Sequence, residues 1–484
     1  MVFTSLIFMF VFSPICITGY YLLIWVQKKL ETVRRFRLPD VFLTLASIGF
    51  YGWAGMNDLL GLCIFVVVVY LFGRWIQYAK DKKQNGGKRV ILSISIVIFI
   101  AVLYYFKYYN FIAGILNEWF GITIAMRPVW TLLGVSFITF SAISYFVDIY
   151  RNDAKAGSFL DTALYLTFFP KVVSGPIVLW KDFSGNLSER SVSDEQFIYG
   201  INRLIIGAAK KVILADTLGA LASNIQTQAA YGIDIPTAWG CVFIYFLQIY
   251  YDFSGYSDMA LGLSAMFGFR FKENFHFPYI STSITEFWRR WHISLGSWFR
   301  EYVYIPLGGN RKGFARTLIN LSIVFFLTGI WHGSGWGYLC WGILHGVCMI
   351  IERCVRNNKV YLKIPRFIKW IVTMFIVMMG WQVFRLGDLS QCIEFGKIML
   401  GVTKFDAINF TYQYYFTAKI IFLVIIGIIG AVFLSSDKIK MFYHKFAVRK
   451  WGFVIQEVLL LILFVLCILF IVNSTYSPFI YFQY

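Results

Sequence analysis

LINLSIVFFLTGIWHGSGWGY, from Leu318 to Tyr338, is the stretch that decides the fold. Its first part, Leu318–Leu327, is apolar apart from one Asn and one Ser. Such a run is typical of a membrane-crossing helix, and it predicts that His332 lies well into the membrane. Ionisable groups at that depth are costly, so His332 is a candidate for function. The glycines of Gly333–Gly337 would loosen the helix and let another group approach its backbone. The alternative is a core histidine whose ring is satisfied by a backbone carbonyl.

The composition of the whole chain indicates the same class of protein. Of its 484 residues, 59% are hydrophobic and only 14% are charged, whereas an average soluble domain has about 25% charged residues. A soluble protein has too little interior for so much apolar surface, which excludes soluble enzymes, disordered chains and disulfide scaffolds. We therefore expect a lipid bilayer around the chain. The net charge of +19 fits basic cytoplasmic loops, so it does not predict a nucleic acid partner.

The apolar runs predict an all-α polytopic membrane protein with about ten to twelve transmembrane helices of about 20 residues each. The first run, Val2 to Val26, is followed by basic residues and lacks the marks of a signal peptide. We therefore expect a retained first helix with its N-terminus outside. A basic cluster at 80–89, with Asn85–Gly87 as a loop tip, would mark a cytoplasmic end. The other expected spans are 41–53, 58–75, 90–111, 129–150, 237–251, 315–339, 367–384, 419–434 and 453–472.

Between about 159 and 310 the apolar stretches become shorter, and Pro, Gly and charged residues interrupt them. Broken backbone at membrane depth survives only where it is buried in protein or lines a water-filled cavity. This region therefore predicts re-entrant and amphipathic segments around a tunnel, with 181–196 as a polar loop. The resulting division of one integral-membrane domain is 1–158 for N-terminal helices, 159–350 for the catalytic core and 351–484 for C-terminal helices.

A second histidine lies in the segment EFWRRWHISLGSWFREY, Glu286–Tyr302. Read as one helix, the segment gathers aromatic residues and a histidine on one broad face. The alternative is an interfacial amphipathic helix held by an aromatic belt, which explains the Trp and Arg residues but not the histidine. The residues on the shared face would be Trp288, Trp291, His292, Leu295 and Trp298.

The remaining histidines and the cysteines carry weaker signals. On a continuous helix His345 would point about 140° away from His332, so it reads as a weaker candidate with a structural alternative. His444 lies in a basic stretch that we expect to be a solvated loop. The eight cysteines form no C-x-x-C pair and no Cys/His ligand spacing. We therefore interpret them as small buried hydrophobic residues and expect no metal site.

Several motifs make the chain resemble the membrane-bound O-acyltransferase superfamily, and within it the AlgI-like polysaccharide O-acetyltransferase branch. The resemblance extends over nearly the whole chain, and its most specific parts are 287–295 and 304–311. It implies the fold of that family, in which the broken middle third forms a catalytic tunnel across the membrane. The motifs are MVFTS at 1–5, YLTFFPK at 165–171, SGPI at 174–177, YDFSGYSD at 251–258, FWRRWHISL at 287–295, YIPLGGNR at 304–311, TGIWHG at 328–333 and PFIYFQY at 478–484.

The resemblance assigns the family's essential histidine to His332 and its second histidine to His292. It implies O-acetyl transfer from acetyl-CoA or another acyl thioester that enters from the cytoplasm, without a tightly bound cofactor. A neutral His332 would accept the proton of an acceptor hydroxyl as that hydroxyl attacks the thioester carbonyl. His292 would donate a hydrogen bond to the carbonyl or position the donor. We expect further substrate contacts from Trp288, Arg289, Arg290, Trp291, Ser294, Trp331, Asp252 and His345.

The same resemblance implies partners and a location. The acceptor would be an exopolysaccharide or cell-surface polymer, reached directly or through an extracytoplasmic SGNH-type acetyltransferase, and the site would be the bacterial cytoplasmic (inner) membrane. Arg289, Arg290, Lys210 and Lys211 could steer a polyanionic donor such as coenzyme A or an acyl carrier protein. Positive-inside topology and contact with anionic lipid are the favoured explanation of these charges.

Three alternatives remain open at the level of sequence. The nearest is a D-alanyl transferase of teichoic acid modification, which shares the histidine pair within the same superfamily. A transporter would need coordinating ionisable groups and often internal repeats, and the sequence contains no repeat. A non-catalytic membrane scaffold for an extracytoplasmic partner would keep its function without the histidines.

Overall fold

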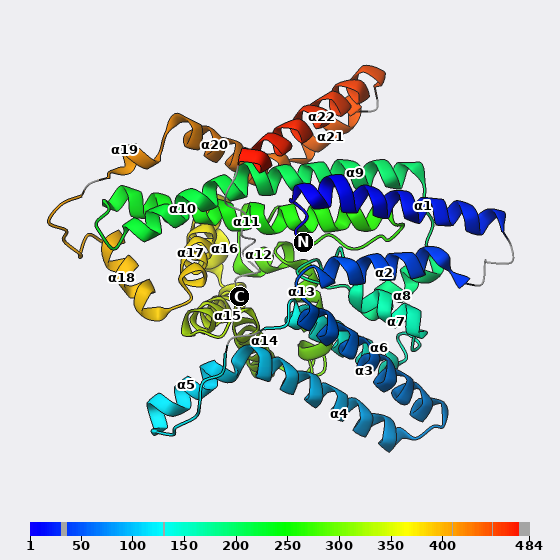
Figure 1. Ribbon diagram of the computed structural model, residues 1–484. Coiled ribbons are helices and arrows are strands. Elements are labelled where there is room, and N and C mark those ends of the chain that lie inside the picture. Colours follow the sequence, from blue (N-terminus) through cyan, green and yellow to red (C-terminus); the bar gives the residue numbers. More distant parts are fainter. Residues whose placement is uncertain (31–35, 129–130, 409, 448, 474–484) are drawn as a thin grey trace. The chain divides into compact units, whose positions relative to one another are not determined.

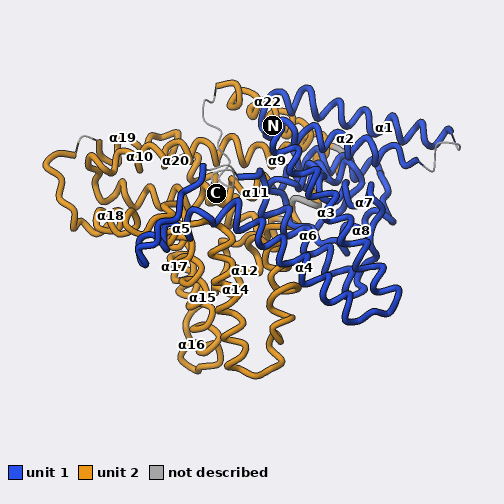
Figure 2. Tube along the Cα trace, turned by 60° about the horizontal axis from the view of Figure 1, so that its bottom comes forward, with its two compact units in different colours: residues 1–204, 257–272 blue, residues 205–256, 273–484 orange. Residues whose placement is uncertain are grey.

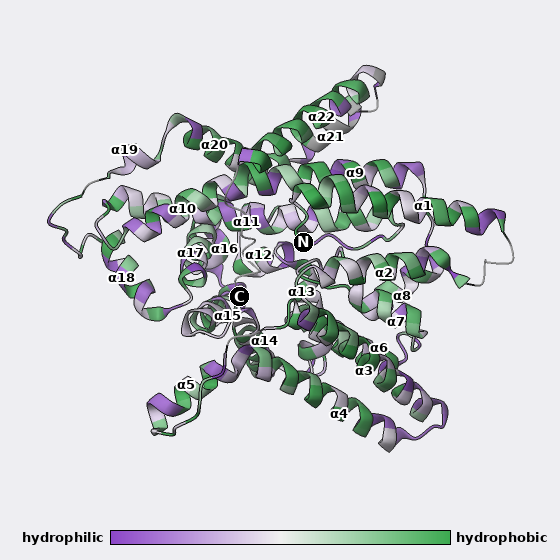
Figure 3. Ribbon diagram, viewed as in Figure 1, coloured by the Kyte–Doolittle hydropathy of each residue, from purple (hydrophilic) through white to green (hydrophobic). Residues whose placement is uncertain are grey.

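The computed structural model describes residues 1–30, 36–128, 131–408, 410–447 and 449–473, so the motif at 478–484 lies outside the described residues. Within these ranges, eight helices are long and apolar enough to cross a membrane. The prediction of an all-α multi-pass membrane protein is therefore confirmed, and hydrophobic residues dominate the long helices in Figure 3. In Figure 1 these spans are α1 (Ser13–Lys29, with a turn from Phe8), α3 (Met56–Asp81), α4 (Asn85–Leu103) continuing into α5 (Tyr109–Phe120), α14 (Phe314–His332), α15 (Trp336–Val355), α17 (Arg366–Leu386), α20 (Ala418–Val432) and α22 (Lys450–Asn473).

The described chain forms two compact units, which Figure 2 colours separately. The first unit holds 1–204 and 257–272. It includes the shorter apolar helix α2 (Leu38–Gly52) and, at its centre, α6 (Val135–Arg151), which is buried from Val135 to Ile149. Hydroxyl pairs join α6 to α7 (Phe159–Thr167): Tyr145 to Thr162 at 3.0 Å, and Ser144 to Tyr165 at 2.8 Å. These pairs offset the cost of burying four hydroxyl groups between the two helices.

The second unit holds 205–256 and 273–484. Its α14 and α15 form a hairpin in which glycines allow the two backbones to touch. A Cβ atom at Gly342 would lie 2.6 Å from the carbonyl oxygen of Phe325, and one at Gly329 would lie 2.7 Å from that of Tyr338. Small residues at a helix interface permit such close packing in membranes. The unit also contains α10 (Asp216–Gln228), α12 (Ile284–Arg290), α13 (Ile293–Phe299), α16 (Lys359–Lys363), α18 (Leu389–Met399), α19 (Tyr412–Tyr415) and α21 (Asp437–Ala447).

Only part of the middle third consists of short helical pieces, because 194–228 is one continuous helical run and α11 (Ile235–Met266) is also long, and two more specific expectations there are wrong. The segment 181–196 is not a loop: it contains α8 (Trp180–Glu189) and the start of α9 (Asp194–Ala209), and α8 buries Trp180 and Phe183. The span expected at 237–251 does not end there, because α11 extends from Ile235 to Met266. A charged residue can lie inside a buried helix when a counter-charge pairs with it. On α11, Asp252 and Asp258 both have cationic partners, Lys211 and Arg203.

Three further boundaries differ from expectation. The run expected at 315–339 breaks after His332, because Gly333 is extended and α15 begins only at Trp336. The expected loop tip Asn85–Gly87 is the first turn of α4, and the turn lies just before it at Lys83, which has a φ of 57°. The basic stretch that includes His444 is the helix α21 rather than a loop, and the side chain of His444 lies outside the described residues.

Replacing Gly337 by alanine should loosen the turn that follows His332. The Gly337 amide donates a 2.9 Å hydrogen bond to the carbonyl of Gly387, and a Cβ at this position would lie 2.5–2.8 Å from three backbone atoms of Gly387. Backbone cannot move aside as a flexible side chain can, so we expect a loss of about 1–3 kcal/mol in the free energy of unfolding. Unfolding in mixed detergent micelles measures this.

Gly396→Ala is the matched control for this substitution. Gly396 lies inside α18, and nothing comes within 4 Å of a Cβ built there. Alanine is favoured over glycine inside a helix by about 0.5–1 kcal/mol, so this variant should be at least as stable as the parent. Equal stability of the two variants would contradict the close approach at Gly337.

Candidate active site

His332 is the last residue of α14 and is 4% exposed. Three aromatic rings surround its imidazole, with centroids at 4.8 Å (Trp331), 4.9 Å (Trp341) and 5.1 Å (Phe384), all edge-on. The helix stops here because Gly333 is extended, and the space that a side chain on Gly333 would need is filled by the ring of Tyr338. The glycine-rich turn therefore leaves an imidazole in an apolar aromatic box at a helix end.

His292 lies at a break between two short helices rather than inside one. α12 ends at Arg290 and α13 begins at Ile293, while His292 has φ 45° and ψ 53°, the left-handed conformation. The expected continuous helix over Glu286–Tyr302 is therefore wrong. Left-handed backbone costs an L-residue about 1–2 kcal/mol, so other contacts must hold this break. The periodicity of the aromatic residues carries no information about such contacts.

The His292 ring is buried against aromatic neighbours. It is 1% exposed, and its centroid lies 4.6 Å from the ring of Phe253 on α11, nearly perpendicular to it. Burial lowers the pKa of His292 to about 3, so the imidazole is neutral across the physiological range. A neutral imidazole has one N–H donor and one acceptor nitrogen.

Trp331 links the two histidines. Its ring centroid lies 6.1 Å from that of His292 and 4.8 Å from that of His332. Residues from α14 and from the α12–α13 break thus meet across one indole ring. The two histidines that the sequence singled out are therefore neighbours of the same side chain in the second unit.

His345 belongs to the same aromatic cluster, on the other side of Trp341. Trp341 lies one turn before it on α15 and is 5.2 Å from the His345 ring and 4.9 Å from the His332 ring. The indole N–H of Trp288 donates a long hydrogen bond, 3.4 Å, to Nδ1 of His345. This bond places the His345 ring proton on Nε2. His345 thus contacts His332 through an intervening indole, as a supporting residue would.

Four of the other predicted substrate contacts, Trp288, Trp291, Arg289 and Arg290, lie in different surroundings. Trp288 packs edge-on against Trp341 at 5.6 Å and so reaches the cluster, whereas Trp291 is fully buried against Trp381 at 4.6 Å. Arg289 is exposed. Arg290 forms an ion pair with Glu286 at 2.9 Å. These positions favour Arg289, rather than Arg290, as the residue available to an anionic group.

Asp252, expected to contact substrate, lies in a buried ionic triad with Lys211 and Asp216. Lys211 Nζ is 2.7 Å from an Asp252 carboxylate oxygen and 2.5 Å from one of Asp216, and all three side chains are nearly inaccessible. Burial raises the pKa of Asp216, and the neighbouring Lys211 ammonium opposes this shift. Lys211 is fully engaged by two carboxylates, which argues against the steering role expected for it.

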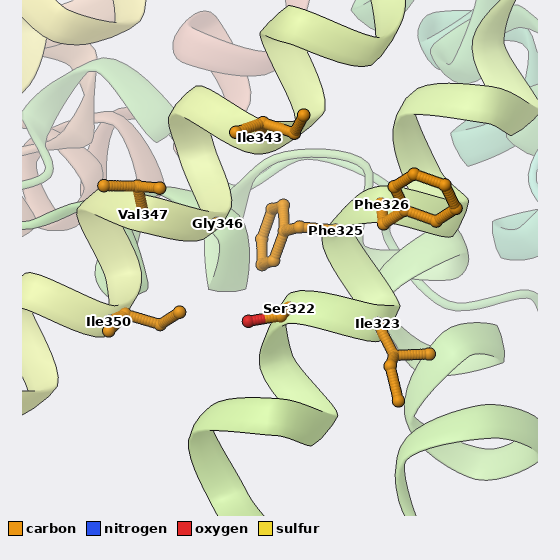
Figure 4. Close-up of a pocket in the computed structure, with 8 residues that line it drawn as sticks. All are labelled: Ser322, Ile323, Phe325, Phe326, Ile343, Gly346, Val347 and Ile350. Atoms are coloured by element: carbon orange, nitrogen blue, oxygen red, sulfur yellow. The ribbon is translucent and has the colours of Figure 1, made fainter.

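A cavity of about 310 Å³ lies between α14 and α15, and Figure 4 shows its apolar lining. Its single hydroxyl, that of Ser322, donates to the carbonyl of Leu318 at 3.1 Å. Phe325 forms one wall and also contacts Trp288, with ring centroids 5.3 Å apart. None of the residues that line this cavity is an acid or a base. The lining residues are Ser322, Ile323, Phe325, Phe326, Ile343, Gly346, Val347 and Ile350.

Sequence reasoning missed several residues of this cluster. Trp341 stands one helical turn before His345, and that spacing was visible. Phe384 lies on α17, and Phe253 lies on α11 beyond the expected end of its span, so only tertiary structure brings them to His332 and His292. In the part of the chain that the structure describes, no group of three or more His, Cys, Asp or Glu side chains could hold a metal ion.

Comparison with known proteins places this site within one family. Residues 50–388, which include all the histidines of the cluster, match the membrane-bound O-acyltransferase family. A relative named probable alginate O-acetylase AlgI, from Pseudomonas aeruginosa, is 40% identical over 81% of this chain and 73% of its own length. One of the same name from Pseudomonas putida is 35% identical over the full length of both chains. A peptidoglycan O-acetyltransferase from Helicobacter pylori is 29% identical over 83% of this chain and 80% of its own. The chain is a multi-pass membrane protein that belongs to the membrane-bound O-acyltransferase family.

Proposed function

We propose that this acyltransferase moves acetyl groups from a cytoplasmic thioester across the bacterial inner membrane for O-acetylation of an extracytoplasmic polysaccharide. The observation that carries the proposal is the pair of buried histidines, His332 and His292, whose rings both contact that of Trp331. The names of the relatives, which act on alginate or peptidoglycan, support acetyl as the group and a polysaccharide as the final acceptor.

In this proposal His332 is the general base. The acceptor hydroxyl oxygen attacks the thioester carbonyl carbon while its proton passes to the imidazole of His332, which forms a tetrahedral intermediate. Collapse of the intermediate breaks the carbon–sulfur bond, and the leaving thiolate takes the proton from the His332 imidazolium. His292, neutral because of its burial, donates its N–H to the developing oxyanion. Preorganised donors of this kind, in a site that excludes water, are a large source of catalysis.

The donor is acetyl-CoA or another acyl thioester, such as an acylated carrier protein. Both are polyanionic, and Arg289 is the exposed cation beside the cluster that suits them. On the outer side, we propose that an SGNH-type acetyltransferase receives the acetyl group and passes it to the polymer. A partner of this kind would explain how a membrane-embedded site serves a polymer too large to enter it.

Acyl analysis distinguishes this function from D-alanyl transfer. We expect polymers from cells that carry the intact gene to release acetate on mild alkaline hydrolysis, and polymers from the deletion strain to release far less. Chromatography of the released acyl groups measures both acetate and D-alanine. D-alanine in place of acetate would support the teichoic acid alternative and overturn the proposed donor.

Proteoliposomes distinguish the enzyme from the other two alternatives. With purified protein and labelled acetyl-CoA, we expect label in an added acceptor or partner, and release of the free thiol in equal amount. Solute flux without acyl transfer would instead indicate a transporter. Normal polymer acetylation by a His332→Ala variant would indicate a scaffold.

A further inference from the structure

The break at His292 is held from outside by the short segment Asn274–His276. The His276 amide donates to the carbonyl of Arg290 at 2.9 Å, just before the break. The Ile293 amide donates to the carbonyl of Asn274 at 2.9 Å, just after it. Two backbone hydrogen bonds therefore fix the chain on either side of the left-handed residue, which local sequence alone would not keep in that conformation.

The side chain of Asn274 adds two further hydrogen bonds to the same turn. Its Oδ1 accepts hydrogen bonds from the Ser294 amide at 3.2 Å and from the Ser294 hydroxyl at 2.9 Å. Asn274 is 0% exposed. The amides at the start of a helix have no partner within the helix, and asparagine is among the best residues at capping them. Here the cap comes from a distant residue, because His292 itself occupies the usual capping position of α13.

We propose that Asn274 is a positioning residue that fixes the His292 imidazole for acyl transfer. This inference rests on the proposed function, in which the His292 N–H meets the oxyanion. The ring direction is set by the backbone of residue 292, and that backbone is set by the α12–α13 turn which Asn274 caps. Misplacement of a catalytic group by about 1 Å can cost roughly 100-fold in rate, so the cap bears directly on turnover.

Steady-state kinetics in proteoliposomes test this role. Asn274→Ala should lower kcat for acetyl transfer by about 10- to 100-fold and change KM for the thioester by less than about threefold, because Arg289, which is proposed to meet the donor, lies on α12 rather than on the helix that Asn274 caps. A merely structural role would reduce the yield or stability of the folded protein and leave kcat per folded molecule unchanged.

A double variant and a matched control make the test specific. If Asn274 acts through His292, adding Asn274→Ala to His292→Ala should cause no further loss, because residues that act as a unit are non-additive. Asn320→Ala is the control: Asn320 is equally buried, donates to the carbonyl of Gly309 at 2.8 Å, and lies on α14 far from its His332 end. It should leave kcat unchanged.

Two outcomes would overturn the inference, and a third concerns the proposed function. Wild-type kcat for Asn274→Ala, or a loss that multiplies with that of His292→Ala, would show that Asn274 does not act through His292. If His292→Ala and His332→Ala themselves retain full turnover, the proposed function has failed, whatever Asn274 does.

Discussion

Replacing His332 by alanine should reduce acetyl transfer by about 10²–10⁴-fold, the range expected for loss of a general base. The imidazole is enclosed by Trp331, Trp341 and Phe384 at ring distances of 4.8–5.1 Å. Water has little access to this box, so bulk solvent cannot replace the missing base. The rate of label transfer from acetyl-CoA in proteoliposomes measures the effect, with the amount of inserted protein determined in parallel.

Two comparisons make this result interpretable. Thr328→Val removes a hydroxyl one turn earlier on α14 that donates to the carbonyl of Val324 at 2.7 Å, and it should leave the rate near that of the parent. His292→Ala should lose less activity than His332→Ala, because a hydrogen-bond donor to the oxyanion is removed while the base remains. A His332→Ala protein that is normally inserted and fully active would refute the base assignment.

The position of His332 was accessible from sequence because local signals agree there. A clean apolar run predicts the span, and the glycines of Gly333–Gly337 predict a loosened helix beside His332. Neither signal depends on distant residues. The placement of His332 in an apolar segment and the all-α architecture followed from composition and periodicity, whereas the break after His332 did not, because the span was expected to continue to residue 339.

The geometry at His292 was not accessible for the opposite reason. The Trp residues of 288–298 repeat at helical spacing, so local preference favours one continuous helix. Tertiary hydrogen bonds from Asn274 and His276 outweigh that preference and bend the chain at His292. The partner of Asp252 was hidden similarly, since Lys211 lies on another segment, and only the folded unit brings them together.

Lys211→Met should be among the most destabilising substitutions in the protein, by about 3–5 kcal/mol in the free energy of unfolding. Lys211 Nζ is 2.5 Å from Asp216 and 2.7 Å from Asp252, and all three side chains are at most 8% exposed. Removing the ammonium leaves two carboxyl groups buried without their counter-charge. Unfolding in mixed detergent micelles measures the loss, and the yield of inserted protein should fall with it.

A surface pair provides the matched control for this prediction. Lys397 and Glu394 form an ion pair of similar length, 2.8 Å, but their side chains are 47% and 65% exposed. Exposed pairs contribute about 0.2–1 kcal/mol, so Lys397→Met should change stability little. The contrast separates the effect of burial from the effect of forming an ion pair.

Neutralising the whole triad tests the cause of the loss. In Lys211→Met/Asp216→Asn/Asp252→Asn, no charge remains to be desolvated, and replacing a complete buried ion network often costs little. We therefore expect this triple variant to be more stable than Lys211→Met alone, although it carries more substitutions. If the triple variant is instead the less stable of the two, the lysine contributes through packing of its aliphatic stem rather than through its charge.

The same variants also reveal whether the triad supports the catalytic cluster, because Phe253, beside Asp252 on α11, contacts the His292 ring at 4.6 Å. The kcat measured on the folded fraction should fall with Lys211→Met and recover in the triple variant.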